Sequence, residues 1–251
     1  MAERAPVLEV ENVRRAFGGV RAVDGVSFAL ERGEIRALIG PNGAGKSTFF
    51  DILTGQLRAD AGEVRWRGRP IGGLPPHAIW RLGISRTFQI TATFATLTVL
   101  ENVQVARLSH AGRSRVLLIP AARLEIAPSR ALLEQVGLAE QAARAAGVLA
   151  YGDLKKLELA IALANDPALL LLDEPTAGMA PGERGALMAL TARIARERGL
   201  TVLFTEHDMD VVFAVAERIM VLHQGRVIAD GPPAAVRADR EVQAVYLGED
   251  P

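Results

Sequence analysis

The stretch Gly40–Thr48 constrains the fold of this 251-residue chain more than any other feature. It matches Gly-x-x-x-x-Gly-Lys-Ser/Thr, the pattern of loops that cradle phosphate groups. The apolar segment Ile35–Ile39 before it predicts a buried strand, and Phe49 and Phe50 after it predict the start of a helix. Because a phosphate loop needs a strand before it and a helix after it, this context favours an α/β core.

The residue types in this loop suit phosphate binding. Glycines let the backbone bend so that successive N–H groups face phosphate oxygens, and the following helix N-terminus adds a partial positive charge. We expect Lys46 to reach the β- and γ-phosphates and the Ser47 hydroxyl to bind Mg²⁺. The residues of the loop expected to bind nucleotide are Gly40, Pro41, Asn42, Gly43, Ala44, Gly45, Lys46, Ser47 and Thr48.

Composition narrows the functional classes. Lysine plus arginine and aspartate plus glutamate number 29 each, and this zero net charge argues against binding nucleic acid through a general basic field. The chain has no cysteine, which excludes disulfides and thiolate zinc sites. The polar opening Met1–Pro6 predicts no secretory segment, and no apolar run approaches the ~20 residues of a membrane helix. We therefore expect a membrane role to require a partner.

The expected elements change in character along the chain. Strands and turns are expected up to about residue 67, and the pattern turns helical from about His77 to Leu154. Helices and strands then alternate, and the apolar run Leu169–Leu172 is typical of a parallel strand covered on both faces. We therefore divide the chain into a core lobe, residues 1–78 and 155–251, and an inserted helical lobe, residues 79–154.

Two acids follow the predicted strand Ala168–Leu172. Ligands of open parallel sheets bind beyond the carboxyl ends of the strands, so Asp173 is expected near the phosphate loop. Asp173 would hold the hydration shell of Mg²⁺. Glu174, one residue further, would polarise the attacking water.

Three other residues are candidates on weaker grounds. His207 ends the next predicted strand, Leu200–Glu206, from where it could hydrogen-bond the γ-phosphate. Gln89, at the entrance to the inserted lobe, could bind Mg²⁺ or the attacking water. Phe17 could stack on adenine, although its spacing fits a core phenylalanine equally well.

Taken together, these residues resemble the ATP-binding cassette (ABC) ATPases from end to end. The phosphate loop, Gln89, Leu149–Asp153, Leu169–Glu174 and His207 come in the order and approximate spacing of that family. The resemblance implies an α/β fold: a P-loop NTPase core with an antiparallel β subdomain and an inserted α-helical subdomain. It also implies ATP and Mg²⁺, with ATP hydrolysis coupled to transmembrane transport.

The resemblance also implies a role for each matched residue. Asp173 corresponds to the Walker B acid and Glu174 to the general base. Gln89 corresponds to the Q-loop residue, His207 to the switch histidine, and Phe17 to the adenine-stacking aromatic.

The signature segment departs from the family pattern Leu-Ser-Gly-Gly-Gln. In that family two cassettes pair head to tail, and the signature of one contacts the ATP held by the other. Ala150 lacks the serine hydroxyl that would bond the γ-phosphate, and Ala180 replaces the D-loop aspartate in Ala177–Pro181 at the expected dimer interface. Because neither change affects the hydrolytic groups, we expect a working ATPase. The signature residues expected to bind ATP are Leu149, Ala150, Tyr151, Gly152 and Asp153.

The segments that contain these departures resemble those of one subgroup, the ATPase subunits of branched-chain amino acid importers. The resemblance lies in Leu149–Gly152, Ala177–Met179, Glu206–Val212 and the tail Val242–Gly248. It implies a second ABC ATPase subunit as homo- or heterodimer partner, transmembrane permease subunits and, indirectly, an extracytoplasmic solute-binding protein. The implied location is cytoplasmic, peripheral on the inner face of the cell membrane. We expect Ile90–Leu100 either to contact the permease or to form lobe core.

Other functions stay open at this stage. An ABC ATPase could serve another solute or lipid, such as urea, other amino acids or lipopolysaccharide. It could also act without a transporter, on nucleic acid or ribosomes, although the zero net charge and lack of sustained heptads disfavour this. A kinase or GTPase would leave the signature, Glu174 and His207 unexplained, and no Asn-Lys-x-Asp motif occurs. Ala150 and Ala180 also leave open a non-catalytic regulatory subunit.

Overall fold

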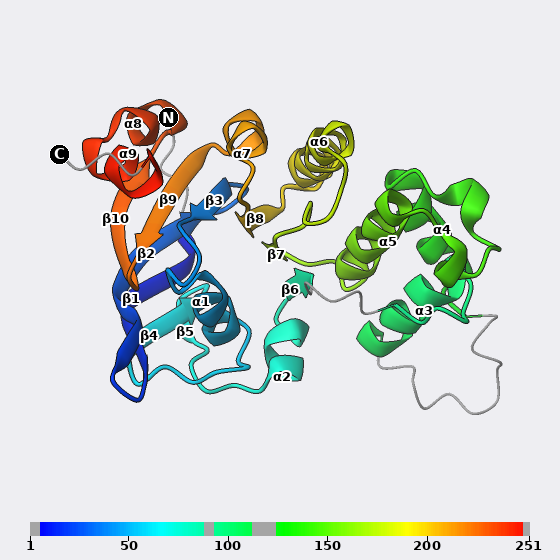
Figure 1. Ribbon diagram of the computed structural model, residues 1–251. Helices are drawn as coiled ribbons and strands as arrows, with labels where there is room; N and C mark the ends of the chain where they lie inside the picture. The colour runs from blue at the N-terminus through cyan, green and yellow to red at the C-terminus, as the bar shows by residue number, and fades with distance from the viewer. Residues whose placement is uncertain (1–5, 88–92, 112–123, 248–251) are drawn as a thin grey trace.

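The computed structural model describes residues 6–87, 93–111 and 124–247. Its described strands form two sheets, one antiparallel and one mainly parallel (Figure 1). The strands are β1 (Pro6–Phe17), β2 (Val20–Glu31), β3 (Ile35–Ile39), β4 (Ala61–Trp66), β5 (Arg69–Pro70), β6 (Ile84–Thr87), β7 (Leu169–Asp173), β8 (Thr201–Thr205), β9 (Arg218–His223) and β10 (Arg226–Gly231).

Helices occupy most of the connections between these strands. The α-helices are α1 (Lys46–Leu53), α2 (Pro76–Arg81), α3 (Val99–His110), α4 (Ile126–Gln135), α5 (Tyr151–Leu163), α6 (Pro181–Arg198), α7 (Met209–Val215), α8 (Pro233–Ala238) and α9 (Arg240–Leu247). The short 3₁₀ helices are η3 (Ala139–Gln141) and η4 (Ala146–Val148). Within the described residues, no helix is both long enough and apolar enough to span a bilayer.

The strand order brings the phosphate loop after β3 and the acids at the end of β7 to the same side of the larger sheet, where its parallel strands end. The larger sheet runs β10-β9-β3-β8-β7-β6, with β3, β8, β7, β6 and β9 parallel and β10 antiparallel at the edge. β8 therefore lies between β3, which leads into the phosphate loop, and β7, which ends at Asp173. The smaller sheet, β2-β1-β4-β5, is antiparallel throughout. This confirms the predicted α/β fold with an antiparallel β subdomain.

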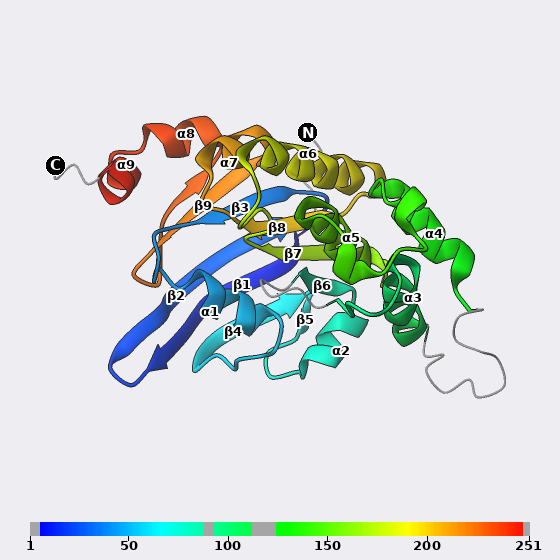
Figure 2. The ribbon, with the colours of Figure 1, turned by 45° about the vertical axis from the view of Figure 1, so that its right-hand side comes forward.

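The central strands are buried on both faces, as their apolar runs predict. In β7, Leu170 and Leu172 join one apolar core, while Leu169 and Leu171 join another. This alternation follows from the two-residue period of a strand. Helices α6 and α7 cover one face of the larger sheet, whereas α1 and the antiparallel sheet lie on the other (Figure 2).

Helices α3, α4 and α5 form a separate group beside the sheets (Figure 1). Their packing agrees with the helical character predicted for residues 77–154, but that stretch also contains β6, which the sequence pattern did not predict. β6 pairs with β7 from Ile84 to Thr87 and so belongs to the larger sheet. Helix α5 crosses the predicted lobe boundary at residue 154. The division into lobes stays a prediction, and the pairing of β6 favours a lobe that begins after Thr87.

Candidate functional site

The phosphate loop has the tight geometry that its glycines predict. Gly45 has φ 105°, and a Cβ there would lie 2.0 Å from the Ala22 carbonyl oxygen. A Cβ on Gly40 would lie 2.1 Å from the Leu222 carbonyl oxygen. A side chain is therefore excluded at both positions by backbone on two neighbouring strands. Helix α1 begins at Lys46, so the N–H groups of its first turn have no partner within the helix and face the loop.

A cavity of about 180 Å³ lies over this loop. It is lined by Ala22, Glu174 and the loop residues Asn42, Gly43, Ala44, Gly45, Lys46, Ser47 and Thr48. Glu174 comes from the turn after β7, more than 120 positions along the chain, as expected if strand ends meet at one edge. The cavity thus joins backbone amides, a lysine, a hydroxyl and a carboxylate, a set suited to a phosphate chain and its attacking water.

Lys46 is the buried cation of the site. Its Nζ donates to the carbonyl oxygens of Gly40 at 2.6 Å and Pro41 at 3.1 Å, and so lies folded back over the loop. Burial lowers the pKa of Lys46 below its ordinary value, and the charges of Glu174 and Asp173 partly oppose this shift. The two acids are therefore electrostatic neighbours of the lysine, as the sequence predicts.

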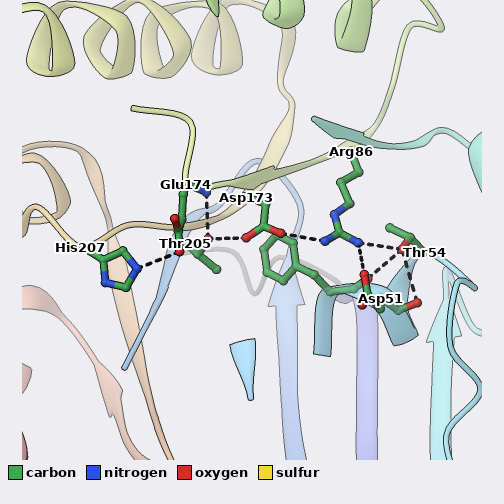
Figure 3. A network of polar contacts seen from close by, with 8 residues as sticks. Asp51, Thr54, Arg86, Asp173, Glu174, Thr205 and His207 are labelled. Carbon is green, nitrogen blue, oxygen red and sulfur yellow. Dashed lines mark hydrogen bonds and ion pairs between the residues drawn. The ribbon is translucent and has the colours of Figure 1, made fainter. Parts of the chain in front are cut away.

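Asp173 is held by hydrogen bonds on both carboxylate oxygens (Figure 3). Oδ1 accepts from Thr205 Oγ1 at 2.9 Å, and Oδ2 accepts from Arg86 Nη2 at 2.7 Å. The register of β7 and β8 sets Asp173 opposite Thr205. The predicted neighbourhood of the two strand ends is thereby confirmed, with Thr205 as the residue between them.

Glu174 and His207 meet in front of this edge. Glu174 Oε1 and His207 Nε2 are 2.8 Å apart (Figure 3), and the Glu174 N–H donates to Thr205 Oγ1 at 3.0 Å. Glu174 has φ 48°, a left-handed conformation that costs energy for a non-glycine residue and is frequent at functional sites. The contact between the two side chains brings a candidate general base and a candidate phosphate sensor together.

Several polar residues that sequence reasoning missed organise this edge. Glu206 is buried, and its carboxylate accepts from Thr176 N at 2.9 Å, from Thr176 Oγ1 at 2.5 Å and from His207 N at 3.1 Å. It therefore ties the turn after β7 to the end of β8. Thr205 and Glu206 directly precede His207, and this clustering of polar residues at a strand end was the available signal. Arg86 carried no such signal.

Two further predicted site residues are Gln89 and Phe17. Gln89 lies outside the described residues. Phe17 ends β1 with 47% exposure, and the Arg15 guanidinium carbon lies 4.8 Å from its ring centroid. This exposure rules out the alternative that Phe17 is a core residue, and the Arg15 guanidinium lies over its ring.

The signature residues do not line the cavity over the phosphate loop of their own chain. Tyr151 is 45% exposed, and its hydroxyl donates to the Ala177 carbonyl oxygen at 2.9 Å. Asp153 accepts from Gln141 Nε2 at 2.7 Å and from Lys156 Nζ at 2.9 Å, so it is engaged within the helical region. These contacts hold Tyr151 and Asp153 against other segments of their own chain.

Both departures from the family pattern fall at helix N-caps. Ala150 is the N-cap of α5 and Ala180 the N-cap of α6, each with extended backbone and without a side-chain capping bond. Serine and aspartate, the family's residues there, are strong N-caps, whereas alanine is a poor one. The two alanines therefore leave α5 and α6 without a side-chain capping group.

The donor set fits Mg²⁺ bound through a nucleotide. No group of three or more histidine, cysteine, aspartate or glutamate side chains capable of holding a metal occurs among the described residues. Mg²⁺ typically takes one or two protein oxygens together with phosphates and waters, and the Asp173 carboxylate and Ser47 hydroxyl are of that kind. One oxygen of Asp173, however, already accepts from a cation, Arg86.

Comparison with known families agrees with this geometry. The family described as ABC transporter matches residues 23–177, and the family described as branched-chain amino acid ATP-binding cassette transporter matches residues 226–251. The second match covers β10 and the C-terminal helices and includes the segment Val242–Gly248.

Similar proteins match the chain over nearly its full length. The high-affinity branched-chain amino acid transport ATP-binding protein BraF of Pseudomonas aeruginosa is 42% identical, covering 97% of this chain and 98% of its own. LivG of Escherichia coli, which carries the same description, is 41% identical over the same shares.

Solved structures extend the similarity to the fold. The ADP conformation of MJ1267, an ATP-binding cassette of an ABC transporter, gives a TM-score of 0.87 at 32% identity, covering 98% of this chain and 100% of that one. A nucleotide-free ATP-binding cassette gives 0.86 at 31% identity over the same shares. The chain therefore belongs to the ABC transporter family, as one of its ATP-binding cassette ATPases.

Proposed function

We propose that this cassette hydrolyses Mg²⁺-ATP to drive import of branched-chain amino acids through a membrane partner. The observation that carries the hydrolytic part is the meeting of Glu174 with His207 beside the phosphate-loop cavity. The solute follows from the similarity to BraF and LivG and from the C-terminal family match.

In this proposal the phosphate loop binds the phosphates, and the residues at the ends of the parallel strands act on the attacking water and the γ-phosphate. Lys46 releases the carbonyl oxygens of Gly40 and Pro41 and turns to the β- and γ-phosphates, while the loop amides hold the phosphate oxygens. Glu174 orients the attacking water and accepts its proton. His207, 2.8 Å from Glu174, reaches the γ-phosphate and responds to its loss. Phe17 stacks on adenine, and Gln89 binds Mg²⁺ or the water.

Asp173 and Ser47 are the residues proposed to hold Mg²⁺. The metal, when bound, neutralises charge on the β- and γ-phosphates. Asp173 is preoriented for this task by Thr205, whose hydroxyl donates to the acid and accepts the Glu174 N–H. Thr205 thus sets the position of Asp173, the proposed Mg²⁺ ligand, relative to Glu174, the proposed general base.

The proposed assembly has further subunits. A second cassette pairs head to tail with this one and receives Leu149–Asp153 against its own nucleotide. Transmembrane permease subunits bind on the cytoplasmic side of the membrane, which makes this chain peripheral on the inner face, and an extracytoplasmic protein delivers the solute to them. No nucleic acid takes part.

A cavity of about 310 Å³ supports a docking surface for the permease. It lies between α2, β6, α3 and α5, with Trp80, Ile84, Ala106 and Ile161 among its lining residues. Because it is mostly apolar and touches both the sheet and the helical group, a partner segment seated there would respond to motion between them. The candidate segment Ile90–Leu100 includes the start of α3 at Val99, and its described part exposes Phe94.

Transport by the complete complex tests this proposal. The chain would be co-expressed with its membrane subunits, and the complex reconstituted in liposomes with labelled leucine, isoleucine and valine. We expect uptake only with ATP and Mg²⁺, and none in a Glu174→Gln complex. Transport of urea or of another amino acid class, with no transport of the three branched-chain substrates, would overturn the solute assignment and retain the ATPase.

A further inference from the structure

Arg86 links two carboxylates, Asp51 and Asp173, the second of which belongs to the proposed metal site. Its Nη1 donates to Asp51 Oδ1 at 2.6 Å and its Nη2 to Asp173 Oδ2 at 2.7 Å, and Nη1 also lies 3.3 Å from Thr54 Oγ1 (Figure 3). The side chains of Arg86 and Asp173 are 9% and 6% exposed. A guanidinium so placed forms a strong, charge-assisted contact with each acid.

The three partners come from elements that surround the nucleotide site. Arg86 lies on β6, Asp173 ends β7, and Asp51 lies on α1, the helix whose N-terminus closes the phosphate loop. Asp51 is in the last turn of that eight-residue helix and Thr54 is its C-cap, so Arg86 contacts the end of the helix opposite the phosphate loop. The arginine therefore connects the acid of the metal site to the helix that presents the phosphate loop.

A cation already bonded to Asp173 opposes a second cation there. Asp173 Oδ2 accepts from Arg86, and its other oxygen accepts from Thr205. Any Mg²⁺ that draws on this carboxylate must either share it with a guanidinium 2.7 Å away or displace that guanidinium. Asp51 moderates the competition because it takes part of the charge of Arg86.

We propose that Arg86 is a positioning residue that competes with Mg²⁺ for Asp173 and thereby sets the Mg²⁺ concentration that nucleotide binding requires. The inference rests on the proposed role of Asp173 toward Mg²⁺. It assigns Arg86 no contact with the substrate. Its effect passes through the charge and orientation of one carboxylate.

The competition predicts that substitutions of Arg86 and of Asp51 change the Mg²⁺ requirement in opposite directions. Arg86→Gln removes the competing cation, so half-saturating Mg²⁺ for nucleotide binding should fall by about tenfold, the size of one charge-assisted hydrogen bond. Asp51→Asn removes the acid that shares Arg86, which leaves more of its charge on Asp173. In this variant the Mg²⁺ requirement should rise severalfold. A purely structural role would move both variants in the same direction.

The chain contains a matched control in Arg36. This arginine is also buried between two acids, 2.7 Å from Glu34 Oε1 and 3.2 Å from Asp230 Oδ2, but on β3 and away from Asp173. Arg36→Gln removes a buried guanidinium of the same kind. It should lower stability and leave the Mg²⁺ requirement unchanged.

The experiment is a Mg²⁺ titration of binding of a non-hydrolysable ATP analogue to the full chain, at constant ionic strength, by calorimetry. Circular dichroism checks the fold of each variant. If Arg86→Gln does not fold, the test uses Arg86→Lys and Asp51→Asn. Arg86→Lys keeps the charge, so its half-saturating Mg²⁺ should stay within about twofold of that of the unmodified chain. Asp51→Asn should still raise the Mg²⁺ requirement.

Asp173→Asn separates failure of this inference from failure of the proposed site. If Asp173→Asn raises the Mg²⁺ requirement but Arg86→Gln and Asp51→Asn leave it unchanged or shift it in the same direction, the competition is wrong and the metal site stands. If Asp173→Asn has no effect, the proposed metal role of Asp173 itself fails, and this inference with it.

Discussion

The edge where the parallel strands end and the segment where α5 begins are organised in different ways. At the strand edge, Asp173 and Glu174 are fixed by side chains of the same chain, Thr205 and His207 among them. At the start of α5, the N-cap Ala150 makes no capping bond, and Tyr151 reaches one exposed carbonyl.

The difference indicates which groups are already held in place within one chain and which are held less firmly. Electrostatic stabilisation of phosphoryl transfer depends on groups held in place before the reaction, and the strand edge meets that condition within one chain. The signature segment does not line the phosphate cavity of its own chain. Substitutions at the edge should therefore change chemistry, and substitutions at the signature should change stability and assembly.

The largest effect expected at the edge is from Glu174→Gln. The amide cannot accept the proton of the attacking water, so turnover should fall by roughly 10²–10⁴, the usual contribution of a general base. Nucleotide binding should persist because Lys46 and the loop are unchanged. Steady-state ATPase of the reconstituted complex and calorimetric ATP binding measure the two properties. Near-normal turnover would remove Glu174 from its role.

The pH dependence of ATP affinity tests Lys46. Burial lowers the pKa of this lysine from its ordinary value, so its charge is lost at lower pH than that of an exposed lysine. The charged form binds phosphates, hence affinity should weaken as pH rises through the lowered pKa, by about tenfold or more once the lysine is neutral. Dissociation constants measured by calorimetry between pH 7 and 10 give the trend.

Lys46→Met is the matched control for that titration. Its affinity should be weaker throughout and should vary little over the same range, since the titrating group is gone. Equal slopes for the variant and the unmodified chain would assign the pH dependence to another group.

Sequence alone predicted the edge better than the contacts that hold it. The run Leu169–Leu172 identified a strand buried on both faces, and parallel adjacency then placed Asp173 near the end of the next strand, as the register confirms. Arg86 pairs with Asp51, 35 positions before it, and with Asp173, 87 positions after it. No local periodicity encodes such contacts.

Strand β6 was missed for a related reason. It has four residues, and its polar Ser85 is buried because the hydroxyl donates to Asn165 Oδ1 at 2.6 Å. A short segment with a polar residue in the interior gives no two-residue alternation of apolar side chains. Its pairing with β7 explains its conformation, and that strand begins at Leu169, opposite Ile84 and 85 positions further along the sequence.

On the signature side, restoring the helix caps should have a moderate effect. Ala150→Ser and Ala180→Asp each supply an oxygen that can accept a first-turn N–H, and each should raise the free energy of unfolding by about 1 kcal/mol. Urea unfolding measures this. Ala189→Ser, at an exposed position inside α6 rather than at an N-cap, is a control that should bring no gain. If neither cap variant gains stability, these helix starts are satisfied in another way.

The smallest effect is expected from Tyr151→Phe. It removes the hydroxyl that donates to the Ala177 carbonyl and retains the ring, whose centroid lies 5.5 Å from Lys155 Nζ. Because the bond is partly exposed and water can replace it, unfolding should lose only about 0.5 kcal/mol, at the low end for a hydrogen bond. A loss of several kcal/mol in urea unfolding would contradict the comparison, because the start of α5 would then be held as firmly as the strand edge. A small loss with impaired ATPase of the assembled complex would sharpen it, since the tyrosine would then act through the partner rather than through the fold.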